Sequence, residues 1–210
     1  MRPTNILRTI AAVSLLSVPV AMQAQGRSAA RPAARQAAAP TNDRDGYSLS
    51  LGLGGGSNGV SCSGCPTDRE NGASGYLRVG KAFTPSVMLG LELNGWNKTQ
   101  NNVTGRETMF SAIGQWYPSM TNGFFTKVGA GMGRMTVDDK SGTTTNKTES
   151  TGFAYQLGLG YDMSIARRWS ITPYVNYLST AGAKAQLNGV DTNQKLDGNY
   201  VQYGLGLSWH

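Results

Sequence analysis

Arg78 and Glu92 are the opposite charges whose spacing most clearly predicts a contact. They stand seven residues before and seven residues after Pro85. If a hairpin turns at Pro85, the two side chains are directly opposed on neighbouring strands. Both fall on the face that carries Gly, Asn and Tyr, and a buried charge without a partner is costly. The spacing therefore predicts a buried ion pair, and Lys127 and Asp162 share the predicted inner face and are expected to extend its network.

Cys62 and Cys65 form a Cys-Ser-Gly-Cys motif. In a cytosolic protein this spacing indicates a redox motif or half of a zinc site. The sequence has no second motif of this kind, no helix is predicted to follow, and the leader described below predicts an oxidising compartment. We therefore expect a local disulfide rather than a metal site.

Groups for catalysis or cofactor binding are scarce. His210 is the one histidine of the chain, whereas outer-membrane lipid-modifying enzymes of comparable size combine a His with a Ser or a carboxylate. The stretch 52–56 is rich in Gly but is not followed by Lys-Ser/Thr and a helix, as a phosphate-binding loop would be. The sequence predicts neither an enzyme nor a bound cofactor.

The net charge of +7 over 210 residues overstates how basic the chain is. Part of it comes from the N-terminal segments, and the remainder is nearly balanced, so nucleic-acid binding is not expected. Residues 1–24 combine Arg2 and Arg8 with an apolar core and read as a signal peptide. Residues 25–45 are rich in Ala, Pro and Arg without apolar periodicity and predict a flexible periplasmic segment. Residues 46–210 form the folded domain.

That domain alternates period-two runs with polar segments, and low charge with 28 Gly favours an all-β fold. Eight strands are predicted, at 46–54, 74–83, 87–97, 107–117, 124–135, 152–162, 169–179 and 200–210. The faces of 107–117 are ambiguous, and we place Phe110 and Trp116 outward. Pro173 cannot donate a ladder hydrogen bond, so a bulge is expected there.

The segments between the predicted strands alternate in length. Those at 84–86, 118–123 and 163–168 are short, whereas those at 55–73, 98–106, 137–151 and 180–199 are long and polar. Short periplasmic turns and long external loops are typical of outer-membrane barrels. Aromatic residues gather at the short-turn end and predict a periplasmic aromatic girdle of Tyr47, Phe83, Trp116, Phe124, Tyr161 and Trp169, together with Tyr117, Phe125 and Trp209.

The stretch 200–210, YVQYGLGLSWH, has an apolar residue at every second position and ends in an aromatic, Trp209. One apolar face and one small, polar face suit a strand between lipid and a crowded lumen. The stretch resembles the final strand of the small bacterial outer-membrane β-barrels of the eight-stranded OmpA/OmpX type. The resemblance implies that Trp209 is read by the barrel-assembly machinery, although His210 makes this aromatic penultimate.

We therefore expect an all-β, eight-stranded antiparallel up-and-down transmembrane barrel in the bacterial outer membrane, in contact with its lipid. The resemblance implies a structural, envelope-integrity or adhesion-like role through the long loops, with an unknown surface ligand. Two alternatives stay open: a narrow path for small hydrophobic solutes, and a soluble lipocalin-like ligand-binding barrel. In the membrane barrel the Arg78–Glu92 pair would act as a plug or as a gate, and the narrow interior of eight strands favours the plug.

Overall fold

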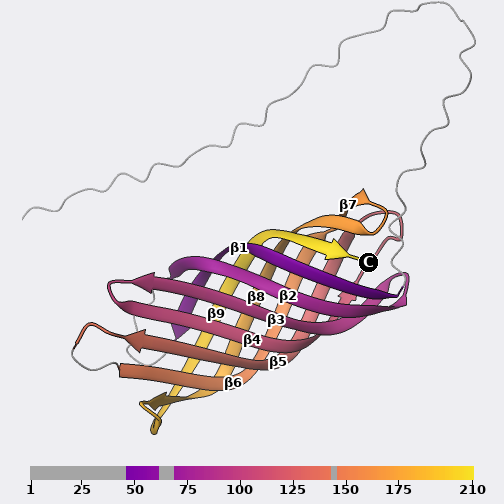
Figure 1. Ribbon diagram of the computed structural model, residues 1–210. Helices are drawn as coiled ribbons and strands as arrows, with labels where there is room; N and C mark the ends of the chain where they lie inside the picture. Colours follow the sequence, from indigo (N-terminus) through magenta and orange to yellow (C-terminus); the bar gives the residue numbers. More distant parts are fainter. Residues whose placement is uncertain (1–45, 62–68, 143–145) are drawn as a thin grey trace, which may run out of the picture. The chain divides into compact units, whose positions relative to one another are not determined.

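The computed structural model describes residues 46–61, 69–142 and 146–210, and these form strands joined by turns (Figure 1). The predicted signal peptide, the segment 25–45, and both Cys62 and Cys65 lie outside the described residues. The strands are β1 (Tyr47–Ser61), β2 (Glu70–Thr84), β3 (Val87–Gln100), β4 (Val103–Trp116), β5 (Phe124–Asp139), β6 (Asn146–Tyr161), β7 (Met163–Ala166), β8 (Trp169–Leu187) and β9 (Val190–Trp209).

The sheet closes on itself. Neighbours pair antiparallel in the order β6-β5-β4-β3-β2-β1-β9-β8-β7, and a further pairing of β6 with β8 completes the ring. The short β7 continues the line of β6 and pairs with β8. Eight long strands therefore form the wall, and the predicted eight-stranded antiparallel barrel is confirmed.

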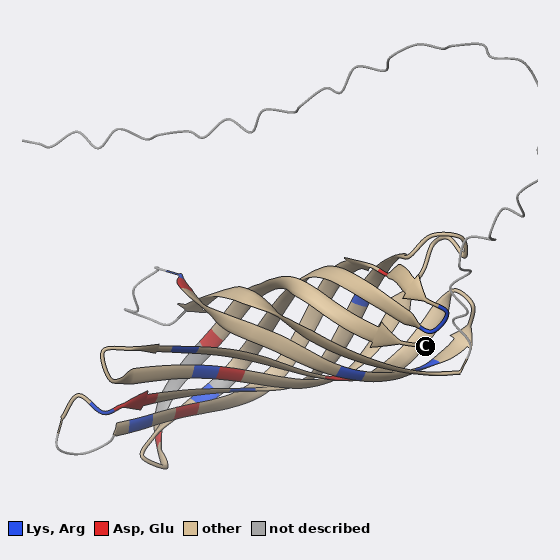
Figure 2. Ribbon diagram, turned by 45° about the horizontal axis from the view of Figure 1, so that its top comes forward, with Lys and Arg blue, Asp and Glu red and all other residues tan. Residues whose placement is uncertain are grey.

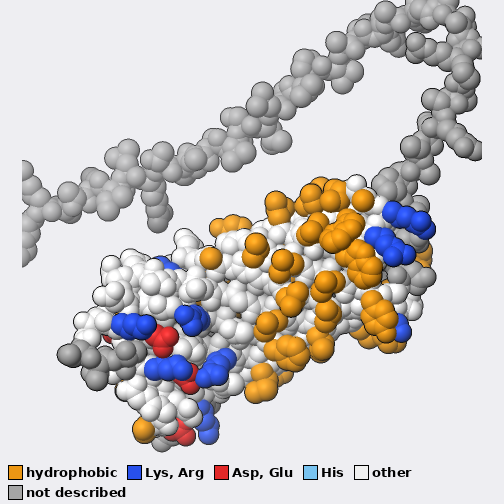
Figure 3. All heavy atoms as spheres, viewed as in Figure 1, with side chains coloured by type: hydrophobic (Ala, Val, Ile, Leu, Met, Phe, Trp, Pro, Cys, Tyr) orange, Lys and Arg blue, Asp and Glu red, His pale blue; other side chains and the backbone are white. Residues whose placement is uncertain are grey.

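The two faces of the wall differ as the alternation predicts. Leu51, Leu91 and Leu205 point outward and are 54%, 46% and 61% exposed, whereas inward residues are small or polar and buried. Phe110 and Trp116 are outward, as expected for the ambiguous strand. Figure 3 shows outward apolar side chains as a band across the visible face of the barrel. This arrangement excludes the soluble lipocalin-like barrel, because such a barrel would need a polar exterior.

The strands run much further than predicted. The prediction of long loops at 98–106 and 180–199 is wrong, because β3 and β4 join at Asn101–Asn102 and β8 and β9 join at Asn188–Gly189. The left-handed φ angles of Asn188 and Gly189, 49° and 83°, suit the tight two-residue turn of a hairpin. Ladder pairing also continues across most of 55–73 and 137–151. The polar segments are therefore strands that extend the wall beyond the apolar band.

The bulge expected at Pro173 is absent. Pro173 pairs in register with Leu205 of β9. The register shifts of β8 lie further along the strand, between Thr180 and Ala183 and between Lys184 and Gln186. On its other side, the pairs Gly160–Tyr174 and Met163–Ile171 bracket Pro173 without a change of register. The missing donor is thus accommodated at the break between β6 and β7, where the ladder is interrupted.

Buried side chains inside the barrel form two apolar clusters. The outer one joins Trp96, Met109, Ala154, Leu178 and Tyr200. The inner one joins Met88, Tyr117 and Phe125 near the short turns. Tyr117 and Phe125 therefore do not belong to the girdle, because their parity turns them into the lumen, where they are 2% and 1% exposed.

No helix in the described part of the chain is long and apolar enough to cross a membrane.

Candidate functional site: the filled lumen and the outer rim

Three charged side chains meet in the middle of the lumen. Arg78 on β2 and Glu92 on β3 are direct cross-strand partners, and Arg78 Nε donates to Glu92 Oε2 at 2.6 Å. Lys127 on β5 donates from Nζ to Glu92 Oε1, also at 2.6 Å. All three residues are at most 3% exposed. One carboxylate thus compensates two buried cations, and charge-assisted bonds of this length are among the stronger hydrogen bonds in proteins.

Neutral groups surround this triad. Gln115 Oε1 accepts from Arg78 Nη1 at 3.2 Å, and Asn94 Nδ2 donates to Glu92 Oε1 at 2.9 Å. The guanidinium carbon of Arg78 lies over the ring of Tyr76, 4.6 Å from the ring centroid. The π face partly offsets the excess positive charge, because aromatic rings attract cations. The arrangement anchors four strands to one another and leaves the charged groups inaccessible to bulk water.

Asp162 is buried as predicted but does not join the triad. Its Oδ2 accepts from Tyr117 at 2.9 Å and its Oδ1 accepts from Thr172 at 2.7 Å. His210 Nε2 lies 3.9 Å from Asp162 Oδ2. Asp162 follows the end of β6, so it lies near the short turns, several residues along the wall from Lys127. It therefore stabilises the inner end of the barrel separately.

Glu107 is a buried carboxylate that the sequence analysis did not single out. Glu107 Oε2 accepts from Asn58 Nδ2 at 2.9 Å, and Glu107 Oε1 accepts from Thr180 Oγ1 at 3.3 Å. Within the described residues no ion pair to Glu107 occurs. Its parity with the inward Met109 and Ser111 was a signal that could have placed it in the lumen.

Six of the predicted girdle residues are exposed at the short-turn end, with Tyr47 and Phe83 the most exposed at 69% each. Trp116, Phe124, Tyr161 and Trp169 are 37–53% exposed. Trp209 pairs with Leu49 of β1 and with Trp169 of β8, so it lies where the last strand closes the ring.

The opposite end of the barrel carries most of the charged residues, which Figure 2 colours along the ribbon away from the C-terminus. There, Glu149 Oε1 accepts from Arg134 Nη2 at 2.7 Å and from Lys147 Nζ at 2.5 Å. The Lys147 and Arg134 hydrogen bonds lower the pKa of Glu149, which lies beyond the apolar band. The Arg134–Glu149 pair joins β5 to β6, whereas Lys147 and Glu149 both lie on β6, in the part of the wall that water surrounds.

The described residues include no group of three or more His, Cys, Asp or Glu side chains that could hold a metal. The Cys62–Cys65 pair lies outside them.

Comparison with known proteins agrees with the architecture. A family model described as the autotransporter beta-domain matches residues 72–180, just over half of the chain. The Neisserial surface protein A structure has a TM-score of 0.53 at 12% identity and covers 79% of this chain and 97% of that one. The structure of Ail, the attachment invasion locus protein of Yersinia pestis, has a TM-score of 0.53 at 13% identity, covering 77% and 99%. No curated protein matches the sequence.

The closed wall, its apolar exterior and the likeness to these solved barrels agree. The chain is a small bacterial outer-membrane β-barrel protein and belongs to the autotransporter beta-domain family.

Proposed function

We propose that this barrel is a non-enzymatic structural protein of the outer membrane, with a sealed lumen and an outer rim that contacts the cell's surroundings. The observation that carries the proposal is the buried Arg78–Glu92–Lys127 triad, with both ion-pair distances at 2.6 Å. Burying these charges carries a desolvation penalty, and only close pairing of the groups offsets it. The network therefore suits a permanent plug better than a water-filled path.

The plug extends beyond the triad. Trp96, Met109 and Tyr200 fill the outer part of the lumen, and Tyr117 and Phe125 fill the inner part. Trp96 Nε1 donates to the Gly56 carbonyl at 3.1 Å, which holds its ring over β2. Apolar clusters toward both ends of the lumen and a charged cluster between them fill space that an ion would need. This favours the plug over the gate.

The outer rim supports the surface-contact part of the proposal. The hairpin of β8 and β9 places Leu187 and Val190 beside its turn, and these residues are 45% and 69% exposed. Apolar residues far from the membrane-facing band suit contact with another molecule rather than with lipid. Ail, one of the similar barrels, is named as an attachment and invasion protein.

Transport of small hydrophobic solutes is the weaker candidate. A shallow hollow on the outer wall, about 390 Å³, is lined by Ala73, Gly75, Gly95 and neighbouring residues. Behind it, the ladders of β2 with β3 and of β3 with β4 are continuous. A lateral path would need these strands to separate, so the hollow alone does not favour transport.

Planar-bilayer recording tests the plug. We expect no conductance steps from the wild-type barrel, because the lumen is filled. A double variant, Trp96→Ala with Tyr200→Ala, empties the outer layer but keeps the triad and should also stay closed. Reproducible steps from the folded wild-type barrel would contradict the proposal and favour the gate.

Binding of whole cells to host or abiotic surfaces tests the rim. Leu187→Ser with Val190→Ser should reduce attachment of cells that display the barrel. The control is Asp138→Asn, a polar change on the same rim. Leu205→Ser with Leu207→Ser would be unsuitable, because these residues face lipid. Equal attachment by cells that carry no barrel would contradict the proposal.

Three parts of the proposal concern other segments or partners. We propose that residues 1–24 direct export and are removed, which N-terminal sequencing of the membrane-inserted protein checks. We propose a Cys62–Cys65 disulfide, which thiol labelling before and after reduction checks. We also propose that the barrel-assembly machinery reads Trp209, and the variant that tests it is described below.

A further inference from the structure

A row of outward side chains marks the outer edge of the apolar band. Thr108 of β4 pairs with Arg134 of β5, Arg134 pairs with Thr151 of β6, and Thr151 pairs with Lys184 of β8. All four side chains are exposed. Cations and hydroxyls therefore alternate across four neighbouring strands. With strands about 4.8 Å apart, the backbones at Arg134 and Lys184 are roughly 10 Å apart, with Thr151 between them.

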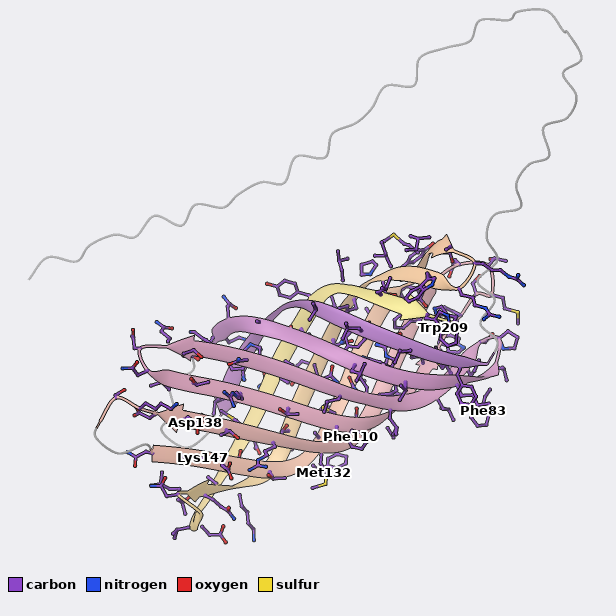
Figure 4. The ribbon with its side chains drawn as sticks, viewed as in Figure 1. Phe83, Phe110, Met132, Asp138, Lys147 and Trp209 are labelled. Atoms are coloured by element: carbon purple, nitrogen blue, oxygen red, sulfur yellow. The ribbon has the colours of Figure 1, made fainter. Side chains whose placement is uncertain are left out.

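The next outward row toward the membrane is apolar. Phe110 pairs with Met132, and Met132 pairs with Phe153, each two residues along its strand from the first row. These side chains are 54%, 63% and 60% exposed. Figure 4 shows Phe110 and Met132 on the outer surface of the wall. The change from apolar to cationic within one row, about 7 Å, places Arg134 and Lys184 at the headgroup level of the outer leaflet.

The charges around this row favour an anion. Arg134 gives one hydrogen bond to Glu149 and keeps other donors of its guanidinium fork, whereas Lys184 has no acidic partner among the described residues. The carboxylates Glu149, Asp138 and Asp191 lie beyond this row, further from the apolar band. The row nearest the lipid thus carries only positive charge. Phosphate is an anion that Arg binds through its guanidinium fork and that Lys binds as a point charge.

A polar hollow adjoins the row. It has a volume of about 390 Å³ and is lined by Glu149, Ser150, Thr151, Gly182, Lys184, Gln186 and Asp191. Gly182, with φ of 68°, lies where the register of β8 shifts and is part of the lining of this hollow. Its size falls within the range of small-molecule sites. Its carboxylates, amide and hydroxyls suit the hydroxyl groups of a sugar.

We infer that this patch binds a phosphorylated glycolipid of the outer leaflet. The acyl chain lies along Phe110, Met132 and Phe153. The phosphate sits between Arg134 and Lys184 and accepts a hydrogen bond from the Thr151 hydroxyl, while the sugar occupies the polar hollow. A lipid is favoured over a soluble sugar phosphate because the apolar row continues directly from the cationic one. The inference does not depend on whether the lumen conducts.

The test measures lipid retention by the full-length chain, folded into phosphatidylcholine nanodiscs that contain a phosphorylated glucosamine lipid. Native mass spectrometry counts the bound glycolipid. The variant is Arg134→Ala with Lys184→Ala, and the matched control is Lys81→Ala with Lys140→Ala, which removes the same charge from exposed positions outside the patch. Heat-modifiability on a gel verifies that each barrel is folded. Thr151→Val provides a milder change of the same patch.

The Arg134/Lys184 variant should bind the glycolipid about tenfold more weakly, whereas the control should match the wild type. Thr151→Val should fall between them. Removal of the phosphates from the lipid should weaken wild-type binding to the level of the variant. Equal retention by the variant and the wild type would overturn the inference. So would equal binding of the sugar phosphate without acyl chains, which would assign the patch to a soluble ligand.

Discussion

Glu92 holds Arg78 at 2.6 Å on one carboxylate oxygen and Lys127 at 2.6 Å on the other. The first contact joins direct cross-strand partners, and the second spans β4 inside the lumen, from β3 to β5. Because one anion serves two buried cations, the triad is asymmetric. Loss of Glu92 leaves both cations without a counter-ion, whereas loss of Lys127 leaves the Arg78–Glu92 pair intact.

Glu92→Gln should therefore destabilise the barrel strongly, by about 3–5 kcal/mol, because two buried cations lose their counter-ion. Lys127→Met should cost less. The double variant Glu92→Gln with Lys127→Met should lose less unfolding free energy than the two single variants lose in sum. It removes one of the two cations that would otherwise lack a counter-ion. Urea unfolding in lipid vesicles measures each free energy. Additive effects would show that the triad is not one coupled unit.

Loss of the Glu107 charge should have little effect on stability, unlike loss of the Glu92 charge. Glu107→Gln keeps one oxygen that can accept from Asn58, and its new amide N–H can donate to the Thr180 hydroxyl, which can also accept. It removes a charge without a described cationic partner, so it should change the free energy of unfolding by less than about 1 kcal/mol. Glu107→Ala leaves both donors unsatisfied and should cost about 1–3 kcal/mol. The same vesicle assay checks both. A large loss in Glu107→Gln would indicate that the charge itself is required.

Gly52 should not tolerate a side chain. A Cβ on this inward residue would overlap the ring of Tyr76, which is buried against Tyr174 with ring centroids 4.8 Å apart. Gly52→Ala should therefore cost about 1–3 kcal/mol through overpacking. Gly95→Ala is the matched control, because a Cβ there meets nothing within 4 Å. Equal unfolding midpoints for the two variants would contradict tight packing around Tyr76.

The Glu149 ion pairs should make the outer rim sensitive to acid. Hydrogen bonds from Lys147 and Arg134 lower the pKa of Glu149. A lowered folded-state pKa stabilises the fold at a pH above the unfolded value, and this contribution is lost as the pH falls through the folded value. Lys147→Ala should shift the pKa of Glu149 upward, measured by the carboxyl carbon signal in an NMR titration. An unchanged titration would show that Lys147 does not hold the carboxylate.

Trp209→Ala should reduce the amount of folded barrel in the outer membrane several-fold while leaving the stability of refolded protein little changed. Trp169→Ala is the control, because Trp169 pairs with Trp209 and faces the same rim. Quantitative blotting of heat-modifiable protein measures assembly, and urea unfolding in vesicles measures stability. Equal assembly defects in the two variants would assign the effect to the girdle rather than to a terminal signal.

Much of the architecture follows from local patterns. Period-two alternation gives the membrane-spanning part of each strand and its outward face, because lipid on one side demands apolar residues at every second position. The outer parts of the strands have water on their outer side, so no apolar alternation marks them, and segments such as 98–106 were mistaken for loops. Asn188–Gly189 is a hairpin signal that could have corrected this for β8 and β9.

The sequence by itself determined the eight strands, their facing and the Arg78–Glu92 contact, because a short turn at Pro85 fixes the register of its two strands. Only the tertiary structure decided which distant side chains share a level of the lumen. Inside the closed barrel Lys127 of β5 reaches past β4 to Glu92 of β3, while Asp162 binds Tyr117 and Thr172 instead. Strand tilt and closure set these levels, and no local pattern encodes them.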